Sequence, residues 1–168
     1  DPQLNAVSTV TSPGELEPAV RARCSTIACD AVTALGAVGV FAVELFLTEH
    51  GELYINEISP RVHNSGHLTM HAFNHDQFEQ HMLTVSGQPV AALAPCAPAA
   101  VMLNLLYDDS MAAAHTGMPY EAPLDEPGHT TLHWYGKPEA RPGRKMGHIT
   151  ALGDTPDIAL ERAQRGLA

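Results

Sequence analysis

The sequence has few basic residues, few cysteines and no long apolar run. Nine Lys and Arg stand against nineteen Asp and Glu, a net charge of −10 that argues against a nucleic-acid-binding surface, because such a surface needs a basic stripe. No apolar run approaches the roughly 18 residues of a membrane span, and no basic-then-apolar signal peptide opens the chain. The three cysteines show no zinc spacing. We expect them to be buried thiols in a reducing compartment, which fits a cytoplasmic location.

The chain does contain enough apolar sequence for a packed core. Its 168 residues are 45% hydrophobic and 17% charged, which is typical of globular rather than disordered proteins. Residues 88–98 are rich in Pro and Ala and are interpreted as a linker, so we expect two domains, residues 1–90 and residues 91–168. The chain opens at Asp1 without a methionine, which indicates a piece of a longer or processed protein.

The first domain is expected to combine strands with two helices. Residues 4–11 are rich in Val and Thr and predict a strand. A Ser-Pro-Gly-Glu capping sequence at residues 12–15 predicts a helix that ends at Gly36. A second helix is predicted over residues 76–86.

The second domain is expected to be small and rich in strands. Strands are predicted at residues 99–106, 130–135 and 145–152, with a short helix around residues 110–115 and a closing helix over residues 155–166. The inward side of the closing helix is expected to hold Ala159, Leu160 and Ala163. Together the two domains predict an α+β fold class.

The most informative stretch is a predicted β-hairpin between residues 39 and 58, in which Glu44 and Glu57 interrupt apolar faces. If its turn is symmetric about His50 and Gly51, the two glutamates lie directly opposite each other, with Cβ atoms roughly 4.5–5.5 Å apart. Like charges at that separation need a shared proton or a divalent cation, and paired carboxylates suit Mg²⁺. An odd-length loop would break this register. The alternative is a pair of glutamates that reach solvent at a sheet edge.

A polar loop at residues 59–67 follows the second strand of the hairpin. It contains one cation, two imidazoles, an amide and two hydroxyls. Binding groups usually sit on loops of this kind at the end of a rigid strand. Three further histidines, His71, His75 and His81, are interpreted as ordinary surface or core residues, because no thiolate or carboxylate spacing supports a zinc site.

Four of the nine basic residues are concentrated between the last two predicted strands: Lys137, Arg141, Arg144 and Lys145. Glycine and proline in the same segment allow backbone N–H groups to approach a phosphate, and Arg supplies a fork for its oxygens. The segment is therefore a candidate anion site. A solvated basic hairpin tip is the alternative.

Two strings carry a resemblance to a known family. NEISPRVHNSGH, with GVFAVELF before it, and YGKPEARPGRKMGH closely resemble the N5-carboxyaminoimidazole ribonucleotide synthases of purine biosynthesis, which belong to the ATP-grasp superfamily. The resemblance implies the C-terminal part of an ATP-grasp fold, an antiparallel sheet with packed helices, followed by a small β-rich C-terminal domain. It also implies ATP and Mg²⁺ as cofactors, with 5-aminoimidazole ribonucleotide and bicarbonate as substrates.

The resemblance also implies roles for individual residues. Glu44 and Glu57 would bind Mg²⁺, Asn56 and Glu57 would contact the nucleotide, and Phe46 would pack near the adenine or in the core. Arg61 would bind bicarbonate or the carboxyphosphate that forms from it. Beside Arg61, the pocket would be lined by His63, Asn64, Ser65 and His67, with one of the two histidines handling the proton of the amine. The 5′-phosphate of the ribonucleotide would be held by Lys137, Arg141, Arg144 and Lys145.

No segment of the chain resembles the family's N-terminal and lid domains, so we expect the isolated chain to have no ligase activity. The family further implies a homodimer and a functional partnership with carboxyaminoimidazole ribonucleotide mutase. Two alternatives remain open. One is another ATP-grasp ligase, of the glycinamide ribonucleotide transformylase or biotin carboxylase type. The other is a non-catalytic assembly module with the same fold.

Overall fold

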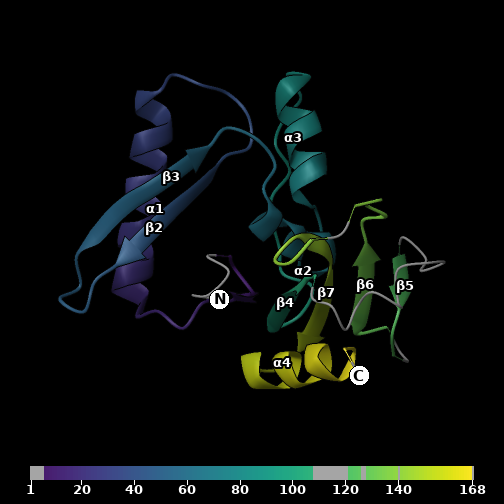
Figure 1. Ribbon diagram of the computed structural model, residues 1–168. Coiled ribbons are helices and arrows are strands. Elements are labelled where there is room, and N and C mark those ends of the chain that lie inside the picture. The colour runs from purple at the N-terminus through teal and green to yellow at the C-terminus, as the bar shows by residue number, and fades with distance from the viewer. Residues whose placement is uncertain (1–5, 108–120, 126–127, 140, 168) are drawn as a thin grey trace. The chain divides into compact units, whose positions relative to one another are not determined.

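The computed structural model describes residues 6–107, 121–125, 128–139 and 141–167 (Figure 1). These residues form two compact units, one made of residues 14–94 and the other of residues 6–13 together with residues 95–167. Each unit combines helices with antiparallel strands, so the predicted α+β fold class is confirmed. Among the described helices, none is both long enough and apolar enough to cross a membrane.

The unit of residues 14–94 begins with helix α1 (Pro18–Ala34) and a hairpin of strands β2 (Ala42–Leu47) and β3 (Leu53–Ser59). α1 lies beside the hairpin (Figure 1), and Arg23 on α1 donates a hydrogen bond of 3.1 Å to the carbonyl of Gly51 in the hairpin turn. The helix begins later than the sequence predicts. Ser12 ends a strand of the other unit, so the expected capping box at residues 12–15 is wrong.

The hairpin exposes much of its apolar sequence. Phe46 is 61% exposed, Tyr54 is 54% exposed and Ile55 is 45% exposed. Apolar residues on both faces of a hairpin are typical of a buried one, but these three side chains are exposed. A two-stranded sheet with one helix beside it has too few layers to cover both of its faces.

The polar loop after β3 folds into two short helices, η1 (Asn64–Leu68) and α2 (Thr69–Ala72), and helix α3 (Gln77–Val85) follows. Asp76 caps α3 by accepting hydrogen bonds of 2.7 and 2.8 Å from the N–H groups of Phe78 and Glu79. The predicted helix over residues 76–86 is therefore confirmed. Its buried side chains, however, are two polar residues, Gln77 and Gln80.

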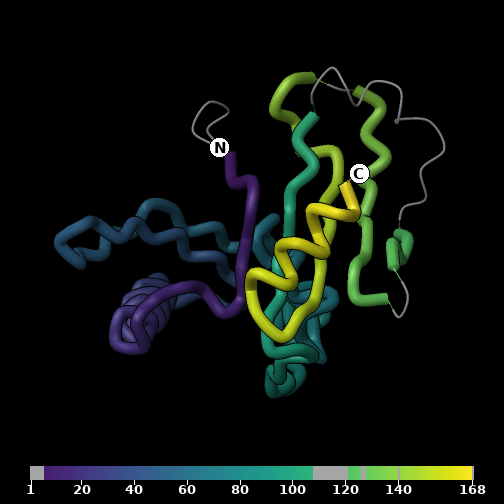
Figure 2. The backbone as a smooth tube through the Cα atoms, turned by 90° about the horizontal axis from the view of Figure 1, so that it is seen from below, coloured from purple at the N-terminus to yellow at the C-terminus, as the bar shows by residue number. Residues whose placement is uncertain are grey.

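The second unit is built around a five-stranded antiparallel sheet with the strand order β1-β4-β7-β6-β5. Its strands are β1 (Thr9–Ser12), β4 (Ala99–Leu106), β5 (Glu121–Pro123), β6 (Thr130–Trp134) and β7 (Lys145–Gly153). Helix α4 (Pro156–Arg165) lies along one face of the sheet (Figure 2). It buries Ala159 and Ala163 fully and Leu160 partly against the strands, as the sequence predicts.

Strand β1 joins the sheet of the second unit because it pairs antiparallel with β4, placing Val10 opposite Met102. The sequence places these N-terminal residues with the first domain, so the expected division at residue 90 differs from the structure at this end of the chain. Strand β5 was not predicted. The predicted short helix around residues 110–115 lies outside the described residues.

The three cysteines are free thiols, as their odd number and spacing indicate. Their predicted burial is wrong for two of them, because Cys29 and Cys96 are exposed and only Cys24 is half-buried. Cys29 belongs to α1, a helix that has no fully buried residue.

Candidate functional site

The two hairpin glutamates lie directly opposite each other, since Glu44 pairs with Glu57 in the register of β2 and β3. This confirms the predicted pairing, but the turn is centred on His50 and not between His50 and Gly51, because Leu47 pairs with Leu53. Close to the turn, Leu45 pairs with Ile55, so one extra residue, Asn56, is accommodated between the two pairs as a β-bulge. The bulge offsets the five-residue turn, and that is why an odd-length loop still brings Glu44 to Glu57.

The bulge also changes the direction of the Asn56 side chain. Strict alternation would send Asn56 to the face opposite Glu57. Instead, its amide Nδ2 donates a hydrogen bond of 3.0 Å to Oε2 of Glu44. The other carboxylate, Glu57, accepts a hydrogen bond of 2.6 Å from the hydroxyl of Ser59. The hairpin therefore gathers two carboxylates and one amide, each oriented by a neighbour.

The donor chemistry of this cluster fits a hard divalent cation. Carboxylate oxygens from Glu44 and Glu57 suit Mg²⁺, which commonly takes one or two carboxylates and completes its coordination with phosphate oxygens and waters. Glu57 is exposed and Glu44 is half-buried, so both can be reached by a nucleotide phosphate. Ser59, which orients Glu57, is buried and fixes that side of the cluster.

The loop that follows β3 connects to the hairpin through His63. Its Nε2 lies 3.6 Å from Oε1 of Glu44. Its Nδ1 lies 2.9 Å from the hydroxyl of Ser65 and accepts a long hydrogen bond, 3.4 Å, from the backbone N–H of Ser65. Because a backbone N–H can only donate, the neutral His63 ring carries its proton on Nε2, facing Glu44.

Arg61 is the exposed cation of the same loop. Its Nη1 donates a hydrogen bond of 3.0 Å to the carbonyl of Val62, and the residue as a whole is exposed. Asn64 begins η1. The loop thus places the Arg61 cation and the Nε2–H donor of His63 a few residues after Glu57.

Sequence reasoning missed one residue of this region, Gln77. It is 7% exposed and hydrogen-bonds to both the N–H and the C=O of His63 as well as to the ring of His67. A polar residue one position after the N-cap of a helix gives no periodic signal. Only its burial distinguishes it from an ordinary surface glutamine.

The basic segment lies between β6 and β7 in the other unit. Lys137 donates from Nζ to the carbonyl of Lys145, and its ammonium lies 5.2 Å from the ring centroid of Tyr135. Arg144 donates a hydrogen bond of 2.8 Å to the carbonyl of Glu139 and lies 3.5 Å from its exposed carboxylate. Arg141 is exposed, whereas Lys137, Arg144 and Lys145 are half-buried.

The surroundings of Lys137 disfavour its charged form. Burial, followed by the charges of Arg144 and Lys145, lowers the pKa of Lys137 from its ordinary value of 10.5. A concentration of positive charge that depresses a neighbouring ammonium favours an anion, because a bound phosphate would offset the repulsion. The geometry therefore supports an anion site at Lys137, Arg144 and Lys145.

Arg144→Met should raise the pKa of Lys137 while leaving it below 10.5, because the substitution removes one neighbouring charge but not the burial. Titration of the lysine side chains by NMR measures this shift. Arg165→Met is the matched control, since Arg165 lies on α4 and pairs with Glu161. An unchanged Lys137 midpoint in Arg144→Met would contradict the proposed coupling.

The lowered pKa of Lys137 also affects stability. Because the pKa of this ammonium is lower in the folded than in the unfolded protein, the unfolding free energy should rise with pH between the folded-state and the unfolded-state pKa.

Behind the basic segment, β6 and β7 carry a stacked pair of histidines that sequence analysis did not single out. His133 pairs with His148 in the strand register, and their ring centroids lie 4.7 Å apart. The hydroxyl of Tyr135 lies 2.8 Å from Nδ1 of His148. Both histidines are buried. Tyr135, His148 and His133 thus form a continuous series of contacts from the start of the Lys137 segment into β7 and β6.

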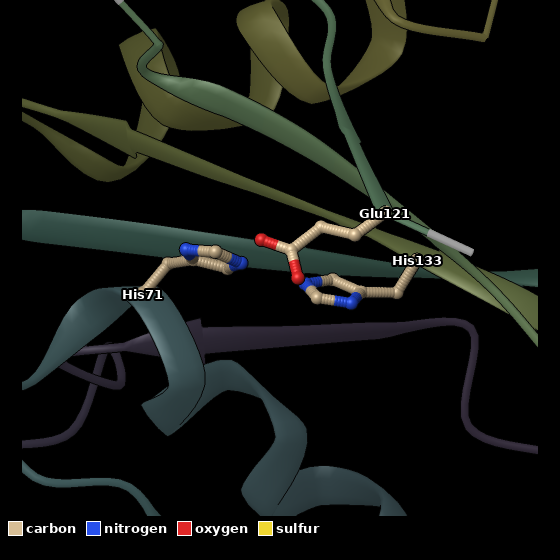
Figure 3. A group of neighbouring side chains, drawn as sticks. All are labelled: His71, Glu121 and His133. Atoms are coloured by element: carbon tan, nitrogen blue, oxygen red, sulfur yellow. The ribbon is translucent and has the colours of Figure 1, made fainter. Parts of the chain in front are cut away.

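Three further histidines were interpreted from the sequence as ordinary residues. His75 lies 2.9 Å from the carboxylate of Glu79 at the start of α3. His71 belongs to α2 and is drawn in Figure 3. The same figure shows the carboxylate of Glu121 beside the ring of His133, two residues that are direct partners in β5 and β6.

Two protein-family models match parts of the chain. The ATP-grasp domain model matches residues 3–78, and the model of the phosphoribosylaminoimidazole carboxylase C-terminal domain matches residues 100–162. The chain is 42% identical to the chloroplastic phosphoribosylaminoimidazole carboxylase of Vigna aconitifolia over 87% of its own length and 26% of that protein. It is 37% identical to the N5-carboxyaminoimidazole ribonucleotide synthase of Synechocystis over 90% of its length and 40% of that protein.

Solved structures give the same result for the fold. The N5-carboxyaminoimidazole ribonucleotide synthetase of Thermotoga maritima matches 94% of this chain and 43% of its own, with a TM-score of 0.76 and 37% identity. The Aspergillus clavatus synthase in complex with ADP and 5-aminoimidazole ribonucleotide matches 97% of this chain and 43% of its own, with a TM-score of 0.79 and 30% identity. The chain thus spans less than half the length of the proteins it matches. In sequence and in fold, it is similar to the C-terminal part of the N5-carboxyaminoimidazole ribonucleotide synthases, with an ATP-grasp domain match followed by a match to their C-terminal domain.

Proposed function

We propose that this chain supplies the metal-binding hairpin and two anion-binding segments of an enzyme that carboxylates 5-aminoimidazole ribonucleotide with ATP and bicarbonate. The observation that carries the proposal is the cluster of Glu44, Asn56 and Glu57, on a hairpin that leads directly into the loop of Arg61 and His63. The Aspergillus clavatus complex with ADP and 5-aminoimidazole ribonucleotide supports the choice of nucleotide and substrate.

The proposed reaction is a phosphoryl transfer followed by a carboxyl transfer. An oxygen of bicarbonate attacks the γ-phosphorus of ATP, the bond to the β-phosphate oxygen breaks, and ADP leaves as carboxyphosphate forms. The exocyclic amine of the ribonucleotide then attacks the carboxyl carbon, inorganic phosphate leaves, and the amine loses a proton. The protein's contribution to such chemistry is mainly positioning and charge neutralisation.

The hairpin residues are assigned to the nucleotide end of the reaction. Glu44 and Glu57 hold Mg²⁺, which when bound neutralises charge on the ATP phosphates. Asn56 orients Glu44 through its amide, and its neighbour Glu57 completes the nucleotide contact. Phe46, which is 61% exposed, offers an aromatic face to the adenine.

The loop residues are assigned to bicarbonate and carboxyphosphate. Arg61 presents an exposed guanidinium fork, the group best matched to a planar oxyanion. His63 directs its Nε2–H toward Glu44, 3.6 Å away, and helps to orient that carboxylate. The remaining lining of the pocket is assigned to Asn64, Ser65 and His67.

The basic segment is assigned to the 5′-phosphate of the ribonucleotide. Burial and then the charges of Arg144 and Lys145 lower the pKa of Lys137, and a bound phosphate dianion would offset the repulsion among the three cations. Arg141 is exposed at the edge of the same segment and adds a longer-range attraction.

The complete activity is proposed for a longer polypeptide. The chain spans 26% and 40% of the two relatives described above, so we expect the 168 residues alone to bind ATP weakly and to lack ligase activity. The complete enzyme is proposed to work in the cytoplasm as a homodimer, and to pass its product to carboxyaminoimidazole ribonucleotide mutase.

The experiment that tests the proposal is an ADP-release assay on the longest polypeptide that contains these residues. With Mg²⁺, ATP and bicarbonate present, release should require 5-aminoimidazole ribonucleotide. Release that is indifferent to the ribonucleotide, but stimulated by glycinamide ribonucleotide or biotin, would support another ATP-grasp ligase. A protein that binds no Mg²⁺-ATP at all would support a non-catalytic module and overturn the proposal.

A further inference from the structure

One buried side chain of α3, Gln77, makes hydrogen bonds to both His63 and His67 of the loop. Gln77 accepts a hydrogen bond of 2.8 Å at Oε1 from the backbone N–H of His63 and donates one of 2.9 Å from Nε2 to the carbonyl of the same residue. This is the pairing that a neighbouring β-strand would give to an extended residue, and His63 is extended, with φ −130° and ψ 154°. Gln77 therefore fixes the His63 backbone as a strand partner would.

The same amide determines which nitrogen of His67 carries the proton. The backbone contacts to His63 allow only one orientation of the Gln77 amide, with its oxygen at the N–H and its nitrogen at the carbonyl. The second N–H of Nε2 then points to Nδ1 of His67, 2.9 Å away. Because Nδ1 must accept this hydrogen bond, the neutral His67 ring carries its proton on Nε2 and is a donor there.

The surroundings leave the Gln77 side chain little freedom. A Cβ added to Gly66 would lie 2.2 Å from Oε1 of Gln77, so the amide occupies the space that a side chain at position 66 would need. The backbone N–H of Gln77 donates a 2.9 Å hydrogen bond to the hydroxyl of Thr69, which in turn donates to the carbonyl of Gly66 at 2.6 Å. The ring of His67 stacks on Phe78, with centroids 5.6 Å apart.

From this geometry we infer that Gln77 is a positioning residue for the anion-handling loop, which it joins to the capped first turn of α3. Two effects follow. The backbone of His63 is held where its Nε2 reaches Glu44, and His67 is kept as an Nε2–H donor suited to an oxyanion, not as a base for the amine. The inference rests on the proposed function only for its effect on turnover; the tautomer and the fixed backbone stand independently of it.

The decisive measurement is the ¹⁵N NMR spectrum of the histidine rings, which distinguishes the two neutral tautomers from the imidazolium. In the unmodified protein, His67 should show an unprotonated Nδ1 and a protonated Nε2. Gln77→Glu places a carboxylate at the same position, which cannot donate to Nδ1. It should convert His67 at neutral pH to the imidazolium and raise its titration midpoint.

Gln80→Glu is a matched control. Gln80 lies on the same helix and is equally buried, at 7%, but its amide donates to the carbonyl of Ala91. This variant should leave the His67 tautomer unchanged. If Gln77→Glu does not fold, Gln77→Met gives a side chain of similar length without a donor and should allow both tautomers of His67. A protonated Nδ1 in the unmodified protein, or an unchanged His67 in the folded Gln77 variants, would overturn the inference.

Kinetics separate this inference from the proposed function. In the complete enzyme, Gln77→Glu should lower kcat for ribonucleotide-dependent ADP release about 10–100-fold, the usual loss when a supporting residue is removed, with little change in the KM for ATP. Gln80→Glu should leave both kcat and the KM for ATP close to those of the unmodified enzyme. If the spectra behave as expected while the unmodified enzyme releases no ribonucleotide-dependent ADP, the role of Gln77 in the loop stands and the proposed function fails.

Discussion

Glu57→Gln in the complete enzyme should reduce ribonucleotide-dependent ADP release by about 10²–10³-fold, the scale of losing one electrostatic partner of a transition state. The substitution keeps the shape of the side chain and its hydrogen bond from Ser59, but it removes one of the two charges that face each other on the hairpin. A cation that relies on both carboxylates loses half of its protein charge. Steady-state kinetics over a range of Mg²⁺ concentrations measure the loss and show whether excess metal recovers part of it.

The control for this experiment is Glu52→Gln, which removes the same charge from the turn of the same hairpin. Glu52 is exposed and accepts a hydrogen bond from the hydroxyl of Tyr54, away from the Glu44–Glu57 pair. It should change ADP release less than twofold, about the effect of an exposed charge. Equal activity of Glu57→Gln and Glu52→Gln would show that Glu57 does not contribute to a metal site.

Arg144→Met should raise the KM for 5-aminoimidazole ribonucleotide by about 10–100-fold, because hydrogen bonds to charged groups are worth about 1.5–3 kcal/mol. The effect should fall on the ribonucleotide and not on ATP, since Arg144 lies on the segment that precedes β7 and not on the hairpin. Initial-rate kinetics with each substrate varied in turn separate the two KM values.

Arg165→Met is again the matched control, because it removes an equal charge from an exposed residue of the same unit. If the two variants show the same KM for the ribonucleotide, the segment contributes only to the overall charge of the protein. A rise in the KM for ATP in Arg144→Met would instead assign the basic segment to the nucleotide and require the site to be redrawn.

The hairpin shows how far sequence reasoning reaches. Alternation and turn chemistry predicted both strands and the pairing of Glu44 with Glu57, because these depend on residues close together in the chain. The same reasoning predicted the inward side of α4 at Ala159 and Ala163. Local periodicity carries this information because the strand pairing of the hairpin and the inward side of α4 are each set by residues close together in the chain.

The misses have a common physical cause. Thr9–Ser12 reads as a strand in the sequence, but its partner, β4, lies some ninety residues later, and nothing local specifies that pairing. Gln77 likewise acts through contacts with residues ten to fourteen positions away. The pairing of His133 with His148 is set by the register between two strands. Interactions between residues this far apart depend on the assembled fold and produce no periodic pattern in the sequence.

The bulge at Asn56 makes the length of the hairpin turn part of the site. Five residues connect β2 to β3, and the extra residue of the bulge restores the register that brings Glu44 to Glu57. A one-residue deletion in the turn would remove the need for the bulge, and Asn56 would then alternate to the face away from Glu44. A change in turn length therefore also changes the contact between the Asn56 amide and Glu44. We expect an insertion or deletion in this turn to be tolerated only together with a second change that restores the contact.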